Sequence, residues 1–187
     1  MRGFDESVSV LTSKEAAIAR SVLKLLYREP LIKIEVQSAD RNERQYYVAA
    51  APLVTIYTPP GRATCGFEAY GITKCHGVYL KDTWRLDLPD FTPEGDTYRW
   101  LMEGQVRNIP QCLIWGDVLD VQYHATKIQT YISMSWASAH DDIFLPHRHY
   151  CLVLDIIRRK QTSFHSSLKA ITGVRDALIG NISSHCY

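Results

Sequence analysis

The sequence has no apolar run long enough to cross a membrane, because its richest run, Ala49–Val54, has only the length of a strand. Residues Met1–Ser9 mix charged and apolar side chains and lack the continuous apolar core of a secretory signal peptide. Charge of one sign is not in excess either: the formal net charge is +1 over 187 residues, which indicates neither a nucleic-acid surface nor an acidic tail. These absences predict an intracellular chain, cytoplasmic or nuclear, with no nucleic-acid partner and no membrane partner.

Cysteine is sparse and irregularly spaced. The five cysteines are odd in number and none of them forms a C-x-x-C pair. They are Cys65, Cys75, Cys112, Cys151 and Cys186. This spacing argues against a disulfide framework and against a structural zinc site. His147 and His149 alternate on the edge of a predicted strand near Asp141 and Asp142, but solvated loop residues are the commoner explanation of such a group, so we expect no metal site.

The first third of the chain predicts a helix followed by two strands. Thr12-Ser13-Lys14-Glu15 has the pattern of a capping box, apolar residues follow at helical spacing, and Pro30 marks the stop. Residues Ile32–Val36 alternate apolar and charged side chains, which is typical of a half-buried strand. Gln45–Tyr57 is apolar and rich in β-branched and aromatic residues, so it predicts a second strand.

The remainder alternates short strands with few helices. The predicted strands are Phe67–Tyr70, Val78–Trp84, Gln111–Trp115, Thr126–Met134 and His149–Ile157. A helix is predicted to open at Pro93-Glu94-Gly95, with Tyr98, Leu101 and Met102 on its apolar face. Apolar residues from Phe164 to Ile182 recur at three and four positions and predict a final amphipathic helix. The order of elements indicates an α+β fold built on an antiparallel sheet.

One stretch carries residues suited to binding a nucleoside triphosphate. Backbone amides of a glycine turn can approach phosphates because no Cβ intrudes, and Gly61 and Gly66 bracket such a turn. Lys81 ends an apolar strand segment and supplies a positive charge, and Glu94 at the predicted helix start can hold that ammonium in place. On spacing alone, a solvated strand lysine and a small generic α+β binding domain remain open as alternatives.

Further segments extend this pattern in the same order. They are Gly61-Arg62-Ala63-Thr64, Val78-Tyr79-Leu80-Lys81-Asp82-Thr83-Trp84-Arg85, Pro93-Glu94-Gly95-Asp96-Thr97-Tyr98, Asn108-Ile109-Pro110, Leu152-Val153-Leu154 and Arg175-Asp176-Ala177-Leu178. Together they resemble the fungal-type protein kinase family, with its G-R-G-T-like turn, L-K-D-x-W-R strand, E-G-x-x-Y helix, H-x-x-L-V-L segment and R-D-A-L helix. The resemblance covers roughly Ala17–Tyr187. It implies a protein-kinase fold that takes ATP and magnesium and phosphorylates serine or threonine hydroxyls.

The resemblance implies a role for each matching residue. Lys81 and Glu94 correspond to the catalytic lysine that contacts the α- and β-phosphates and its helix partner. The residues implied to contact ATP are Gly61, Ala63 and Gly66 in the phosphate turn, Lys81, Leu154 as gatekeeper, and Asp155 and Ile157 in the hinge.

The sequence departs from the family at three points. Ala63 stands where a middle glycine is usual, which predicts weak ATP binding. There is no H-R-D and no D-F-G; His147-Arg148-His149 and Asp142-Ile143-Phe144 both precede the implied hinge. We therefore expect a truncated kinase domain that is inactive alone, with magnesium bound only in a complete parent domain. The alternative is a non-catalytic, pseudokinase-like interaction module that binds a protein partner on the exposed inter-lobe surface.

The expected architecture is a protein-kinase-like N-lobe, with a twisted antiparallel sheet of about five strands and one regulatory helix. We expect three parts: residues 1–57 as a helix and strand extension, 58–157 as the lobe and hinge, and 158–187 as the helical start of a large lobe.

Overall fold

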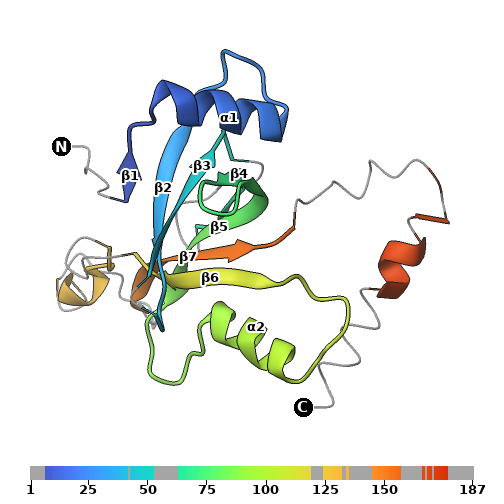
Figure 1. Cartoon of the computed structure of the whole chain (residues 1–187). Helices are drawn as coiled ribbons and strands as arrows, with labels where there is room; N and C mark the ends of the chain where they lie inside the picture. The colour runs from blue at the N-terminus through green and yellow to red at the C-terminus, as the bar shows by residue number, and fades with distance from the viewer. Residues whose placement is uncertain are drawn as a thin grey trace.

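The computed structural model describes residues 7–41, 43–52, 63–118, 124–131, 134, 145–156, 166, 168–169 and 171–176. Within these residues, seven strands form one sheet in the order β1-β2-β3-β4-β5-β7-β6, and every pairing is antiparallel (Figure 1). The strands are β1 Val8–Ser9, β2 Ile32–Gln37, β3 Arg44–Ala49, β4 Cys65–Gly71, β5 His76–Leu86, β6 Cys112–Asp117 and β7 His147–Leu154. The α+β class is confirmed. The sheet is larger than the predicted five strands because β1 and β2 of the N-terminal segment join it.

Helix α1, Ser13–Leu23, covers the outer face of β3 and β4. Its capping box is present: the Thr12 side chain accepts from the Glu15 amide, and the Glu15 carboxylate accepts from the Thr12 amide. The helix ends at Leu23, before the predicted stop at Pro30, because Lys24 adopts a left-handed cap with φ 55°. Among the described residues, no helix is long and apolar enough to span a bilayer.

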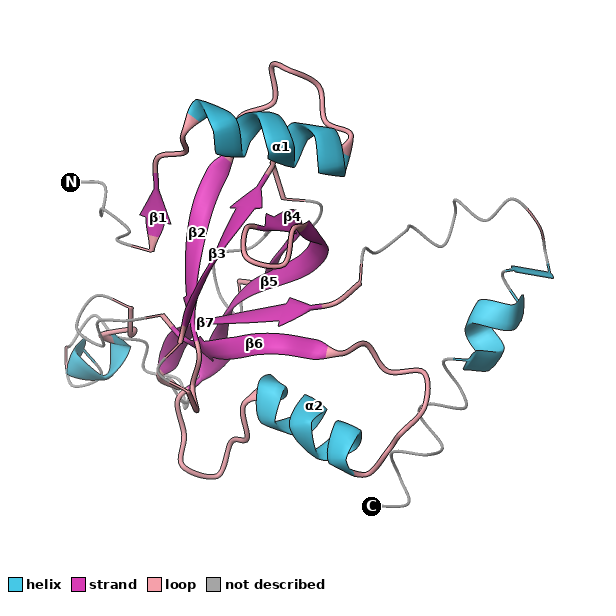
Figure 2. Cartoon of the chain, viewed as in Figure 1, coloured by secondary structure: helices cyan, strands magenta, loops and turns pink. Residues whose placement is uncertain are grey.

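The sheet curls, so its inner face encloses the main apolar core (Figure 2). Alternation along β5 turns Val78 and Leu80 into this core, and Tyr79 faces outward toward the α2 side. Beyond the end of β2, the chain approaches β6, where the Ala39 amide donates to the Trp115 carbonyl at 2.8 Å. Helix α1 and a second helix pack on the outer face of the sheet, and the side chains between the two helices also lie on this face.

Helix α2, Glu94–Glu103, packs on the outer face beside β6 (Figure 1). Gly95 makes the close approach feasible, since a Cβ at that position would lie 2.0 Å from Cγ of Trp115. Tyr98 packs against the cluster around Trp115, as its place on the predicted apolar face requires. Met102 is not part of this cluster, and 41% of it is exposed.

Two sequence-based expectations for the second half are wrong. Ile128–Tyr131 forms a 3₁₀ helix, η1, instead of the predicted strand at Thr126–Met134. Residues just before it pair with the part of β7 that β6 does not reach: Ala125 bridges Arg148, and the Thr126 amide donates to the His147 carbonyl at 2.9 Å. Because β7 lies between β5 and β6 in the sheet, His147 and His149 are on an inner strand and not on an edge; Asp141 and Asp142 fall outside the described residues.

Two further predicted elements extend beyond the residues that the structure describes. Strand β3 ends at Ala49, short of the predicted Tyr57, and 53–62 lies outside the described residues. Residues 168–169 and 171–176 are helical, within the predicted final helix. Their apolar side chains, Leu168, Ile171 and Val174, are 48–74% exposed.

Candidate functional site

An ion pair between β5 and α2 lies at the centre of the candidate site. Lys81 points to the outer face of the sheet from the middle of β5, between Gly66 of β4 and Leu152 of β7 in register. Glu94 is the first residue of α2. The Lys81 Nζ lies 2.5 Å from the Glu94 Oε2, with the two side chains 24% and 39% exposed. The predicted contact between these residues is therefore present.

The start of α2 is fixed beside this pair by a buried tyrosine. The Gly95 amide donates to the Tyr150 hydroxyl at 2.9 Å. Burial raises the pKa of Tyr150 well above its ordinary value, so the hydroxyl stays protonated and neutral. One of the helix's unpaired N-terminal amides is thereby satisfied, and Glu94 is held within reach of β5.

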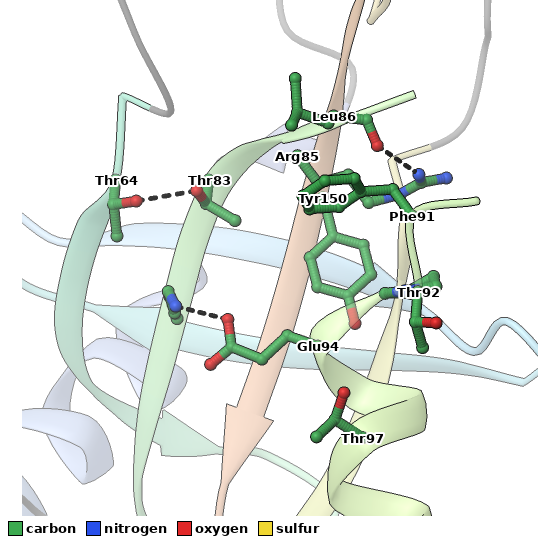
Figure 3. A pocket seen from close by; sticks show the side chains of 11 residues that line it. Thr64, Thr83, Arg85, Leu86, Phe91, Thr92, Glu94, Thr97 and Tyr150 are labelled. Atoms are coloured by element: carbon green, nitrogen blue, oxygen red, sulfur yellow. Dashed lines mark hydrogen bonds and ion pairs between the residues drawn. The ribbon is translucent and has the colours of Figure 1, made fainter. Parts of the chain in front are cut away.

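A cavity of about 320 Å³ opens beside the ion pair (Figure 3). Its lining residues are Thr64, Lys81, Thr83, Arg85, Leu86, Phe91, Thr92, Pro93, Glu94, Thr97 and Tyr150. The hydroxyls of Thr64 and Thr83 lie 2.8 Å apart and tie the start of β4 to β5. A phosphate-sized group has hydroxyl donors and an ammonium to meet here, which is the chemistry that phosphate oxygens require.

The second cation of the cavity is committed elsewhere. The Arg85 guanidinium donates from Nε and Nη2 to the two carboxylate oxygens of Asp117, at 2.7 Å each. The hydrogen bonds to Asp117 raise the pKa of Arg85 above its ordinary value. A bidentate pair of this kind is rigid. Of the two cations, Lys81 is therefore the one better placed to contact a ligand.

The predicted phosphate-turn residues that the structure describes, Ala63 and Gly66, do not line the cavity. Gly61 falls outside the described residues. Ala63 has φ 40°, a left-handed backbone that favours glycine. Gly66 lies inside β4 and not in a turn; a Cβ there would lie 2.1 Å from the Tyr79 hydroxyl. The absence of a side chain at Gly66 therefore makes room for Tyr79, and its predicted role toward phosphate stays a prediction.

The residues predicted for the adenine side are not brought into this cavity. Leu154 is buried in the outer-face cluster beside Tyr79 and does not line it. The Asp155 amide donates to the Gln111 carbonyl at 2.8 Å, and its carboxylate lies 2.7 Å from His76 Nε2. Ile157 falls outside the described residues. Of the predicted site residues that the structure describes, Lys81 and Glu94 line the cavity, and Ala63, Gly66, Leu154 and Asp155 do not.

Sequence reasoning missed the threonines and the tyrosine of the cavity. Thr83 could have been found, because it lies two positions after Lys81 on one strand and so shares its face. Thr64 and Tyr150 require the register of β4 and β7 against β5, which no local pattern supplies.

Comparison with known proteins adds no relative: no family model, no curated protein and no solved structure matches this chain. The resemblance to the fungal-type protein kinases therefore rests on the short motifs alone.

Proposed function

We propose that this chain is a nucleotide-binding lobe of the protein-kinase type, in which Lys81 holds the phosphates of ATP. The observation that carries the proposal is the 2.5 Å contact of Lys81 with Glu94 at the wall of the cavity. The two residues lie thirteen positions apart in sequence and on different elements. Lys33 on β2 also pairs with a glutamate but lies outside the cavity, so it is the pairing together with the cavity that distinguishes Lys81.

The pair has a clear chemical use. An ammonium carries three donors, and Glu94 accepts one of them through Oε2. Glu94 fixes the direction of the remaining donors, and the carboxylate itself is favoured in the first turn of α2, where the helix dipole is positive. The threonine hydroxyls of the cavity add uncharged donors. This set suits a polyphosphate that enters with its own negative charge.

The order of elements also supports the kinase interpretation. The chain runs from β3 through residues 50–64 to β4, then to the lysine strand β5, the glutamate helix α2, and back through β6 and β7. A protein kinase places its glycine-rich loop, lysine strand and glutamate helix in this order. The 187 residues contain neither H-R-D nor D-F-G, so the function proposed for this chain is nucleotide binding without phosphoryl transfer.

Calorimetric titration with ATP tests the proposal. The unmodified chain is expected to bind weakly, and Lys81→Met to lower the affinity by roughly tenfold or more, because a charge-assisted hydrogen bond is lost. Lys33→Met is the matched control: Lys33 is also on the sheet, about one fifth exposed and paired with a glutamate at 2.7 Å, but it lies outside the cavity. Equal affinity in the unmodified chain and Lys81→Met, or no ATP binding at all, would contradict the proposal.

A further inference from the structure

A second polar cluster lies on the inner face of the curled sheet, across β5 and β7. Asp82 is directly opposite Cys151 in register, and Trp84 is opposite His149. Because successive strand residues point to opposite faces, Asp82 faces away from its neighbour Lys81. One ligand atom from each of Asp82, His149 and Cys151 lies within 4.8 Å of the others.

The imidazole of His149 is held in one orientation. Its Nε2 lies 2.5 Å from Asp82 Oδ1, and its Nδ1 lies 3.2 Å from Nδ1 of His124. The Trp84 ring stacks on it with centroids 5.2 Å apart and planes 11° apart. Both His149 and His124 are buried. The side chain that would supply nitrogen to an ion is thus positioned before any ion arrives.

We propose that Asp82, His149 and Cys151 bind a zinc-class transition-metal ion. A thiolate and an imidazole select zinc and its neighbours over magnesium and calcium, which prefer oxygen ligands alone. Three protein ligands leave the fourth position of a tetrahedral ion for water. Sequence spacing does not indicate this site, which is neither C-x-x-C nor a histidine pair on one helix; the sequence places His149 near His147, Asp141 and Asp142, and not near Asp82.

Binding requires a small, local rearrangement. Zinc bonds of about 2.0–2.3 Å in a tetrahedron place donor atoms roughly 3.3–3.6 Å apart. The Asp82 oxygen must therefore withdraw by about 1 Å from His149 Nε2, as the ion replaces the shared proton. Asp82 can make this movement because its side chain is 28% exposed. The Cys151 thiol loses its proton when it binds the ion.

His124 is not one of the three proposed ligands, but it is placed to hydrogen-bond the ligand His149. Once Nε2 of His149 binds an ion, its proton is on Nδ1 and is donated to Nδ1 of His124. Partners of this kind fix the tautomer and orientation of metal-binding histidines. The site joins β5 to β7 on the face opposite Lys81, so it is independent of the proposed nucleotide site.

Titration of the purified full chain with Co²⁺ tests the site by absorption. The unmodified chain is expected to bind a single equivalent, with a thiolate-to-cobalt charge-transfer band in the near ultraviolet, and Zn²⁺ to displace it. Cys151→Ala should abolish the band, and Asp82→Asn should weaken binding by roughly tenfold or more, with His124→Gln lowering it by about tenfold. Lys81→Met should leave cobalt binding unchanged.

Cys112→Ala is the matched control. Cys112 is a buried thiol like Cys151, but it lies in the cluster on the outer face, on the opposite side of the sheet from Asp82 and His149. The band should survive this change. No binding by the unmodified chain, a band that persists in Cys151→Ala, or full affinity in Asp82→Asn would overturn the proposal. Asp82→Asn decides the matter if Cys151→Ala does not fold, because Asp82 is partly exposed.

Discussion

The hydroxyl of Tyr150 accepts a hydrogen bond of 2.9 Å from the backbone amide of Gly95, joining the centre of β7 to the first turn of α2. This bond and the close approach of Gly95 to Trp115 set the position of the helix on the sheet. Glu94, one residue earlier, reaches Lys81 as a consequence. The geometry of the candidate nucleotide site therefore depends on the contacts that Gly95 makes with Tyr150 and Trp115.

Tyr150→Phe removes the acceptor and leaves the Gly95 amide buried without its partner. We expect the free energy of unfolding to fall by about 1–3 kcal/mol, the usual penalty of an unsatisfied buried donor. Urea denaturation followed by circular dichroism measures this change. Tyr27→Phe, at a largely exposed tyrosine, is the control and should leave stability unchanged. Equal stability of Tyr150→Phe and the unmodified chain would show that the bond contributes nothing.

Gly95→Ala places a methyl group where the Trp115 ring already lies. We expect α2 to shift and stability to fall by about 1–3 kcal/mol, as overpacking usually costs, although alanine is the better helix former. The shift should also weaken ATP binding, since Glu94 moves with the helix. Gly104→Ala is the matched control, because Gly104 caps the same helix with φ −73°, which alanine adopts without strain. Unfolding curves that overlay for Gly95→Ala and Gly104→Ala would contradict this account of α2.

Acid should loosen α1 from β2. The hydrogen bond from Lys33, then those from Thr12, lower the pKa of Glu15 from 4.5 to about 2. A folded-state pKa below the unfolded one means that Glu15 stabilises the fold above pH 4.5, and that this contribution disappears as the pH falls toward 2. The free energy of unfolding should therefore fall less steeply with acid in Glu15→Gln than in the unmodified chain. Parallel curves for the two proteins between pH 5 and pH 2 would argue against the Lys33 contact.

The parts of the fold that sequence predicts are those with local causes. The capping box of Thr12 and Glu15 fixes the start of α1 within four residues, so it can be seen without tertiary information. The hairpin of β4 and β5 follows from two apolar segments and a short turn between them. Glu94 was predicted to meet Lys81 through the motif order, and the ion pair is present.

The features that the sequence does not predict depend on contacts between strands that are distant in the chain. The alternation around Ile128 resembles a strand, but pairing with β7 stops at Thr126, whose amide donates to the carbonyl of His147, the first residue of β7. The chain beyond it forms the 3₁₀ helix Ile128–Tyr131. The cluster of Asp82 with His149 joins residues 67 positions apart. Its members meet through the β5–β7 register, which the sequence does not display.

The central claim is that Lys81 recognises phosphate, and the affinities of ATP, ADP, AMP and adenosine for one preparation test it most directly. We predict that affinity falls at each loss of a phosphate in the unmodified chain and that this dependence disappears in Lys81→Met. Lys33→Met should retain it. Equal affinity for ATP and adenosine in the unmodified chain, or a phosphate dependence that survives Lys81→Met, would contradict the account.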